Sequence, residues 1–214
     1  MTIFDKVAAI GVVPVIAIED ARHALPLADA LAEGGLGVIE VTFRTAAAAD
    51  TIRQIAKHRP EMLVGAGTVL TEAQADAAKA AGAMFALSPG IDRAVLDHSA
   101  QIGLPFAPGI MTPSDLQAAL RAGCKLVKFF PAVAAGGLNM LKNIAGPYLH
   151  TGIGFNPTGG VTRENLADWL GYGPVRAVGG TWIATSAGIA AENWDAIRNN
   201  AAEAAALVRH VQGS

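Results

Sequence analysis

Short apolar runs alternate with longer amphipathic, alanine-rich runs along this chain. Each apolar run has the length of a β-strand. Several are almost wholly apolar, which is typical of parallel strands covered by helices on one face and by packed side chains on the other. The predicted strands are residues 12–18, 38–43, 63–66, 84–87, 105–107, 126–130, 153–156 and 177–178.

The amphipathic runs predict one helix after each strand. Asp20 and Thr71 are typical N-cap residues, Pro113 stands in a first helical turn, and Gly82 ends a helix. A further short helix precedes the first strand within the apolar stretch 7–18. The predicted helices are residues 20–33, 46–58, 71–81, 92–102, 112–122, 137–144, 162–170 and 193–210.

Eight strand–helix pairs in 214 residues predict a single-domain (β/α)8 TIM barrel that spans residues 1–214. The alternative is an open, doubly wound parallel sheet. That alternative is weakened because no Gly-x-Gly-x-x-Gly turn follows the first predicted strand.

Composition narrows the classes of partner. Hydrophobic residues make up 52% of the chain and charged residues 16%, against roughly 25% charged in an average soluble protein. This balance favours a large core and an apolar surface buried between subunits. The net charge of −2 offers no basic stripe for nucleic acid, and the stretch 7–18 is too short to span a membrane. We expect neither kind of partner.

Cys124 is the only cysteine, so an intramolecular disulfide and a four-thiolate zinc site are excluded. A small, buried, apolar role is the expected one for this side chain. A reducing cytoplasm fits this usage.

Polar residues and glycines gather just after the apolar runs. In a (β/α)8 barrel these points meet at the carboxyl-terminal mouth, where active sites of this fold are built. Seven such clusters are hard to explain by turn chemistry alone. They are Glu40-Val41-Thr42-Phe43-Arg44, Gly65-Ala66-Gly67-Thr68, Ser88-Pro89-Gly90, Ala107-Pro108-Gly109, Lys128-Phe129-Phe130-Pro131, Asn156-Pro157-Thr158-Gly159-Gly160 and Gly179-Gly180-Thr181-Trp182.

Charged side chains are predicted inside the barrel. Because strand side chains alternate between faces, Glu40, Thr42 and Arg44 share the inward face of the second strand. Lys128 lies mid-strand between apolar neighbours: Leu126, Lys128 and Phe130 are expected to face inward, and Val127 and Phe129 to face the helices. Desolvation and a nearby cation such as Arg44 both favour the uncharged, nucleophilic amine. The alternatives are a structural ion pair between Lys128 and Glu40, or a lysine that reaches the rim to bind phosphate.

Two glycine pairs predict a phosphate site. Gly159-Gly160 precedes Thr162, which is expected to open a helix, and Gly179-Gly180 follows the last strand. Loops in these positions and a helix N-terminus form the usual phosphate site of this fold. Tight turns without a ligand are the alternative.

Metal and serine-hydrolase chemistry are not expected. The five histidines (His23, His58, His98, His150 and His210) fall on predicted helices or loops and not at strand ends. Without imidazoles at the mouth, neither a metal site nor a partner for Ser88 is predicted.

The chain resembles the 2-keto-3-deoxy-6-phosphogluconate (KDPG) aldolase family, which also has 4-hydroxy-2-oxoglutarate (KHG) aldolase activity. The resemblance is carried by short sequence strings, or motifs, that occur in order through residues 11–190. The strings are Glu40-Val41-Thr42-Phe43-Arg44-Thr45, Val64-Gly65-Ala66-Gly67-Thr68-Val69-Leu70, Ser88-Pro89-Gly90, Pro108-Gly109-Ile110, Lys128-Phe129-Phe130-Pro131-Ala132, Gly136-Gly137, Pro157-Thr158-Gly159-Gly160 and Gly179-Gly180 with Trp182.

The resemblance implies a metal-free, cofactor-free class I aldolase that acts on a small keto-acid phosphate. It would be a cytoplasmic homotrimer of the Entner–Doudoroff pathway, with the Schiff base on Lys128 and Glu40 as general acid and base. The implied substrate-binding residues are Arg44 and Thr68 for the pyruvyl carboxylate, Pro89 and Phe130 for the pocket wall, Thr158 for the substrate chain, and Gly159, Gly160, Gly180 and Thr181 for the phosphate.

Two positions depart from the family pattern. Thr181 stands where serine is usual, which keeps the hydroxyl but adds a methyl group, and Phe43 stands where leucine is common. The Thr158 match favours the gluconate substrate over its C4-epimeric galactonate counterpart. A phosphosugar isomerase or epimerase on the same barrel, and a non-catalytic phospholigand-binding barrel, are the two rival functions.

Overall fold

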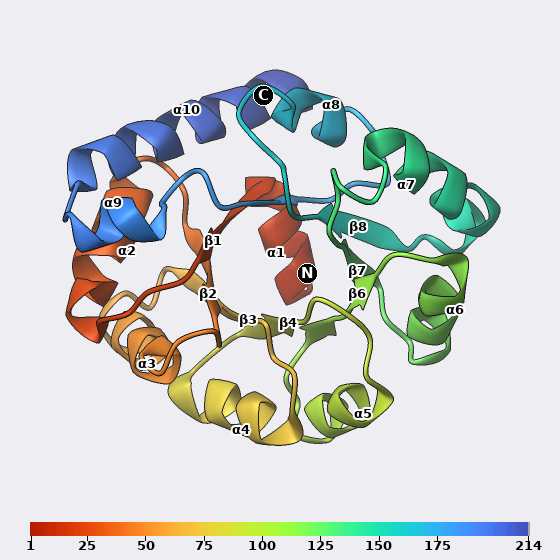
Figure 1. Cartoon of the computed structure of the whole chain (residues 1–214), viewed down its shortest axis with the longest axis horizontal. Helices are drawn as coiled ribbons and strands as arrows, with labels where there is room; N and C mark the ends of the chain where they lie inside the picture. Colours follow the sequence, from red (N-terminus) through yellow and green to blue (C-terminus); the bar gives the residue numbers. More distant parts are fainter. Residues whose placement is uncertain (214) are drawn as a thin grey trace.

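The computed structural model describes residues 1–213, which form a (β/α)8 barrel (Figure 1). All strand pairs are parallel, in a sheet of order β5-β4-β3-β2-β1-β9 and a sheet of order β6-β7-β8. A bridge between Thr158 and Gly179 joins β8 to β9. The strands are β1 Val12–Ile16, β2 Val38–Thr42, β3 Leu63–Gly67, β4 Phe85–Leu87, β5 Phe106–Ala107, β6 Gly109–Ile110, β7 Leu126–Phe129, β8 Gly154–Pro157 and β9 Val178–Gly180.

The fifth barrel strand is interrupted at Pro108, where one strand over residues 105–107 was expected. Because proline has no N–H, it cannot donate to a ladder, and the strand divides into β5 and β6. The Pro108 carbonyl still accepts a hydrogen bond from the Lys128 N–H at 2.8 Å. The two sheets therefore join through one broken strand.

Helices cover the outside of the barrel, and their caps follow the predicted signals. Asp20, Thr71, Asp92 and Thr112 each accept a hydrogen bond from a first-turn N–H. The helical segments are α1 Ile3–Ile10, η1 Ala21–His23, α2 Ala24–Glu33, α3 Ala48–His58, α4 Glu72–Ala81, α5 Arg93–Gln101, α6 Pro113–Arg121, α7 Gly137–Ala145, η2 Gly146–Thr151, α8 Leu166–Leu170, α9 Ser186–Ala190 and α10 Trp194–Gln212. The segments η2 and α9 were not predicted.

The apolar residues form two clusters, as the alternation of strand side chains requires. Val127 and Phe129 of β7 belong to the larger cluster between strands and helices, and Phe129 packs against Trp169 of α8. Leu126 belongs to the smaller cluster inside the barrel. The predicted inward and outward faces of this strand are therefore confirmed.

Helix α1 lies at the centre of the ring of strands in Figure 1, and its residues line a cavity together with the amino ends of β5 and β7, so it covers the amino-terminal end of the barrel. Phe4 contacts Phe85 edge to face, with ring centroids 6.1 Å apart, and Val7 belongs to the interior cluster. The apolar side chains of α1 thus fill the lower part of the barrel, which leaves the carboxyl-terminal part for polar residues.

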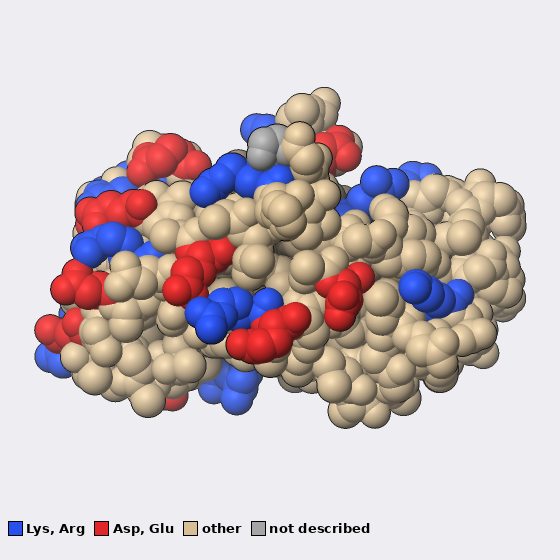
Figure 2. All heavy atoms as spheres, turned by 90° about the horizontal axis from the view of Figure 1, so that it is seen from above, with Lys and Arg blue, Asp and Glu red and all other residues tan. Residues whose placement is uncertain are grey.

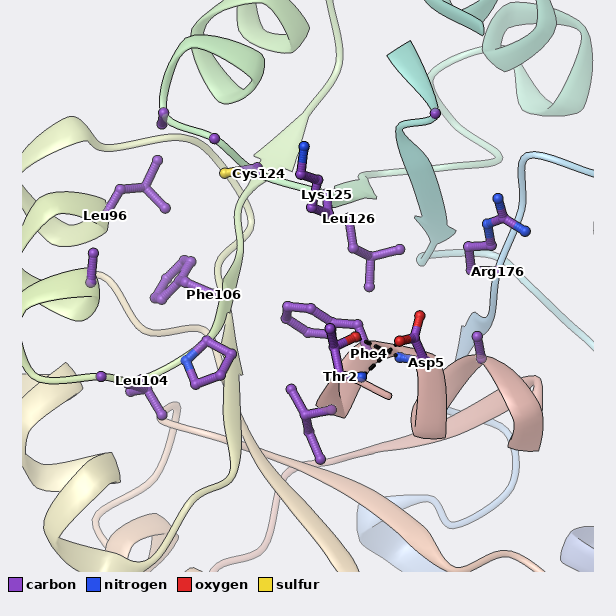
Figure 3. A pocket seen from close by; sticks show the side chains of 18 of the residues that line it. Thr2, Phe4, Asp5, Leu96, Leu104, Phe106, Cys124, Lys125, Leu126 and Arg176 are labelled. Atoms are coloured by element: carbon purple, nitrogen blue, oxygen red, sulfur yellow. Dashed lines mark hydrogen bonds between the residues drawn. The ribbon is translucent and has the colours of Figure 1, made fainter. Parts of the chain in front are cut away.

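A cavity of about 920 Å³ lies beside α1, at the amino ends of β5 and β7 (Figure 3). Phe4, Leu104, Phe106 and Leu126 contribute apolar walls. Cys124 also lines the cavity and is half-buried, and this burial raises the pKa of its thiol. None of the predicted site residues lines the cavity, so it is separate from the mouth of the barrel.

Charges of both signs are interspersed on the face shown in Figure 2, while the right-hand part of that face, on the side of α7, carries few of them. Among residues 1–213, no helix has both the length and the hydropathy needed to cross a bilayer.

Candidate active site

A buried acid–base pair lies in the barrel interior. Glu40 of β2 and Lys128 of β7 are 0% and 4% exposed, and the Lys128 Nζ donates a hydrogen bond to Glu40 Oε1 at 3.0 Å. Four strand positions separate β2 from β7 around the barrel, so the two side chains meet across its interior. Removing two charges from water costs several kcal/mol per ion after relaxation. The attraction between the paired charges offsets only part of this cost.

Small residues make room for the Glu40 carboxylate. Gly65 is the register partner of Glu40, and Gly67 is the partner of Thr42. A Cβ added to Gly67 would overlap Glu40 Oε1. The absence of a side chain at Gly67 therefore allows the carboxylate to point toward Lys128.

Gly67→Ala is expected to displace the Glu40 carboxylate and to lower the kcat of a reaction that uses this carboxylate by about 10²-fold, because small misplacements of a reacting group are costly. Gly37→Ala is the matched control, since a Cβ on Gly37 would meet nothing within 4 Å. Steady-state kinetics of both variants, with thermal unfolding to check folding, make the test. Equal activity of the two variants would contradict this role of Gly67.

Three buried polar atoms in this part of the barrel have no hydrogen-bond partner among residues 1–213. They are Glu40 Oε2, Asn156 Oδ1 and Thr158 Oγ1. Buried polar groups in native proteins are nearly always hydrogen-bonded, so a group of unpartnered ones needs an explanation. A polar ligand that enters from the mouth would satisfy all three.

Arg44 lies beyond the end of β2 and is exposed. The prediction that it shares the inward strand face with Glu40 and Thr42 is wrong, because β2 ends at Thr42 and the chain turns. Thr42 does face inward, but its hydroxyl donates to the Ile16 carbonyl at 2.8 Å. Within residues 1–213, Arg44 makes no ion pair, and its guanidinium is available to an anion at the mouth.

Thr68, Pro89 and Phe130 follow three further strands at the same end of the barrel. Thr68 has φ 55°, in the left-handed region that a β-branched residue seldom adopts. Such backbone strain clusters at functional sites. The Phe130 ring lies with its centroid 5.8 Å from Lys128 Nζ, so an aromatic face adjoins the amine.

The glycine loop after β8 presents free backbone donors. Gly159 and Gly160 have φ of 96° and 81°, a conformation that favours glycine. Neither N–H donates to a residue within 1–213, while Asn165 Nδ2 donates to the Gly160 carbonyl at 3.1 Å. Successive free amides of this kind form an anion site.

The helix expected to start at Thr162 begins instead at Leu166. The Thr162 N–H donates to Asn165 Oδ1 at 2.9 Å in the preceding turn. An anion at this loop would therefore contact loop amides and not a helix N-terminus, which corrects the prediction. Gly180 ends β9 and is buried, and Thr181 is exposed directly after it.

The histidines lie in η1, α3, α5, η2 and α10, away from the carboxyl ends of the strands. Among residues 1–213, no three His, Cys, Asp or Glu side chains form a group that could hold a metal ion.

Asn156 is an interior residue for which the sequence alone predicted no role. The sequence feature that could have identified it is a polar side chain in a buried strand, two positions before Thr158 and therefore on the same inward face.

Comparison with known proteins gives this geometry its context. The family model described as KDPG and KHG aldolase matches residues 3–200. The chain belongs to the KDPG and KHG aldolase family. It is 43% identical over 195 residues to the 2-dehydro-3-deoxy-phosphogluconate aldolase of Haemophilus influenzae, covering 91% of each chain. It is 44% identical over 193 residues to the KHG/KDPG aldolase of Escherichia coli K12, covering 90% of each.

A solved structure supplies the chemical parallel. The Legionella pneumophila KDPG aldolase, with pyruvate captured as a covalent carbinolamine intermediate, superimposes with a TM-score of 0.88 at 40% identity. The match covers 93% of this chain and 96% of that one. The predicted family and barrel fold are therefore confirmed.

Proposed function

We propose that the protein is a class I aldolase that cleaves KDPG to pyruvate and glyceraldehyde 3-phosphate through a Schiff base on Lys128. A second activity, cleavage of KHG to pyruvate and glyoxylate, uses the same pyruvyl site. The observation that carries the proposal is the buried Lys128–Glu40 pair at 3.0 Å inside the barrel. Membership of the KDPG and KHG aldolase family supports it.

The reaction starts with proton transfer inside this pair. Glu40 takes a proton from the Lys128 ammonium, and the free amine attacks the C2 carbonyl to give a carbinolamine. Glu40 returns the proton to the departing hydroxyl, which leaves as water, and a protonated iminium remains. The iminium then accepts the electrons of the bond that breaks.

Glu40, again a carboxylate, removes the C4 hydroxyl proton, directly or through a water. The C3–C4 bond breaks, the aldehyde leaves, and the bonding electrons form an enamine on Lys128. Glu40 then gives its proton to C3, and water hydrolyses the restored iminium to pyruvate and the Lys128 ammonium, which regenerates the starting pair. One carboxylate serves every transfer because its protonation state alternates between steps.

Arg44 and Thr68 hold the substrate carboxylate, and Pro89 and Phe130 wall the pocket around the iminium. The exposed Arg44 guanidinium, which has no ion-pair partner among the residues that the structure describes, suits a bidentate contact with a carboxylate. The free amides of Gly159 and Gly160 bind the phosphate, together with Gly180 and the Thr181 hydroxyl.

Arg44→Gln is expected to raise KM for KDPG by about 10- to 100-fold with a smaller change in kcat, because a hydrogen bond to a charged group contributes about 1.5–3 kcal/mol. Arg53→Gln is the control, since Arg53 lies on α3 and pairs with the exposed Asp50. Initial-rate kinetics separate the two parameters. A normal KM in the Arg44 variant would contradict the assignment.

Thr158 is proposed to set the preference for the gluconate epimer. Its hydroxyl is buried, with the residue 3% exposed, and has no partner within residues 1–213, so it is free to bond a hydroxyl on the substrate chain.

The proposed function is tested by measuring pyruvate release from KDPG, its C4 epimer and KHG. The highest kcat/KM is expected for KDPG, and release of no pyruvate from any of the three would refute the function.

We also propose a cytoplasmic homotrimer built from single barrel domains and acting in the Entner–Doudoroff pathway. Exposed Met111, Val133, Met140 and Leu149 all come from the segment that follows β6 and ends with η2. Figure 2 shows few charges on this side. We propose that these side chains form one apolar patch, of the kind that marks an interaction site. Light scattering after gel filtration is expected to give three times the chain mass, and a monomer mass would contradict the trimer.

A further inference from the structure

Asn156 lies beside Lys128 inside the barrel. In the β7–β8 register, Lys128 is the direct partner of Asn156, and Leu126 is the partner of Gly154. Register partners in a parallel pair point to the same face. A Cβ on Gly154 would lie 3.2 Å from Leu126 Cδ1, which places this face in the interior. Asn156 is 2% exposed.

The Asn156 carboxamide has no partner for its oxygen in the described chain. A buried polar group without a partner costs about 1–3 kcal/mol relative to a satisfied one. The smaller apolar cluster inside the barrel includes Leu126 of β7 and Ala177, and an apolar residue at position 156 would remove the cost. The free oxygen therefore indicates a hydrogen-bond donor that is present only during the reaction.

Lys128, the register partner of Asn156 on the adjacent strand, can supply such a hydrogen-bond donor. Within residues 1–213, its amine hydrogen-bonds to Glu40 alone. During the proposed reaction Glu40 exchanges protons with the substrate, so the Lys128 N–H loses its acceptor at the iminium stage. A carboxamide oxygen on the adjacent strand can replace it without adding a second negative charge.

We propose that Asn156 is a positioning residue: its Oδ1 accepts a hydrogen bond from the N–H of the protonated iminium on Lys128. The contact fixes the plane of the iminium and frees Glu40 for the C4 hydroxyl. This inference rests on the proposed function, because it requires the covalent intermediate.

The test compares Asn156→Leu, which keeps the size but removes the acceptor, with Asn156→Asp, which keeps an oxygen of the same reach. The Leu variant is expected to lose about 10- to 100-fold in kcat, with KM changed less than about threefold. Borohydride trapping with pyruvate should slow by a similar factor. The Asp variant, at its own optimum pH, should regain at least about tenfold over Leu.

Thr51→Val is the matched control, because the Thr51 hydroxyl is also buried and has no partner in the described part of the chain but lies on α3. Thermal unfolding checks each variant, and Asn156→Ala carries the same prediction should the Leu variant not fold. If the wild-type protein is trapped but the Asn156 variants match its kcat and trapping rate within twofold, the inference fails. If the wild type itself is not trapped, the proposed function fails.

Discussion

Replacing Lys128 with methionine is expected to abolish aldol cleavage, with kcat lower by at least ~10⁴-fold, since removing a catalytic nucleophile costs this much or more. Methionine keeps most of the side-chain volume but cannot form an iminium. Pyruvate release from KDPG, followed over long incubations, measures the loss.

Lys125→Met is the control for that variant. Lys125 directly precedes β7 but is exposed at the amino end of the strand, beside the cavity of Figure 3. It should retain wild-type activity. A phosphosugar epimerase on the same barrel would keep much of its activity in Lys128→Met, so residual turnover near the wild-type rate would favour that enzyme class.

Lys128→Met also tests whether the pair with Glu40 is only a structural ion pair. Removing one partner of a buried pair leaves the other charge uncompensated, which typically destabilises a protein by about 3–5 kcal/mol unless the remaining group is neutralised. A purely structural pair predicts a fall in stability alone. A catalytic Lys128 predicts that activity is lost even where the variant remains folded at the assay temperature.

Glu40→Gln is expected to lower kcat by about 10²- to 10⁴-fold, the usual contribution of a general acid–base group. Glutamine has nearly the same shape and keeps an oxygen for the Lys128 N–H, but it cannot accept and return protons. Because the initial, noncovalent binding of KDPG does not depend on these transfers, its KM should change much less than kcat.

Glu33→Gln is the matched control for Glu40→Gln. Glu33 ends α2 and forms an exposed pair with Arg198, and exposed pairs contribute at most about 1 kcal/mol. Parallel kinetics of the two variants decide the role of Glu40. A Glu40→Gln enzyme with more than half of the wild-type kcat would contradict it.

The barrel could be predicted from the sequence because its signals are local. Apolar runs, caps such as Thr71 and Thr112, and stops such as Gly82 each act within a few residues. The period of two in β7 was enough to place Lys128 inside and Phe129 outside.

The errors fall where the chain leaves regular structure. The inward face predicted for Arg44 required β2 to continue past Thr42, and no local signal marks the turn that follows. The helix predicted from Thr162 starts at Leu166 because Asn165 bonds back to the Thr162 N–H and holds a turn. Side-chain competition with helix hydrogen bonds of this kind is hard to read from residue types alone.

The importance of Asn156 could not be inferred from the sequence either. An asparagine after an apolar run is common at a turn, and only the register places it next to Lys128. Likewise, the length of the Lys128–Glu40 contact depends on barrel closure between residues 88 positions apart. Such long-range geometry follows from the packed structure and not from any local pattern.

Borohydride reduction in the presence of pyruvate, followed by peptide mass mapping, tests the Schiff-base mechanism most directly. We expect one reduced pyruvyl adduct per chain, on the Lys128 side chain, with activity lost in proportion to its formation. An unmodified Lys128 in protein that still cleaves KDPG, or an adduct on another lysine that accounts for the inactivation, would contradict the mechanism.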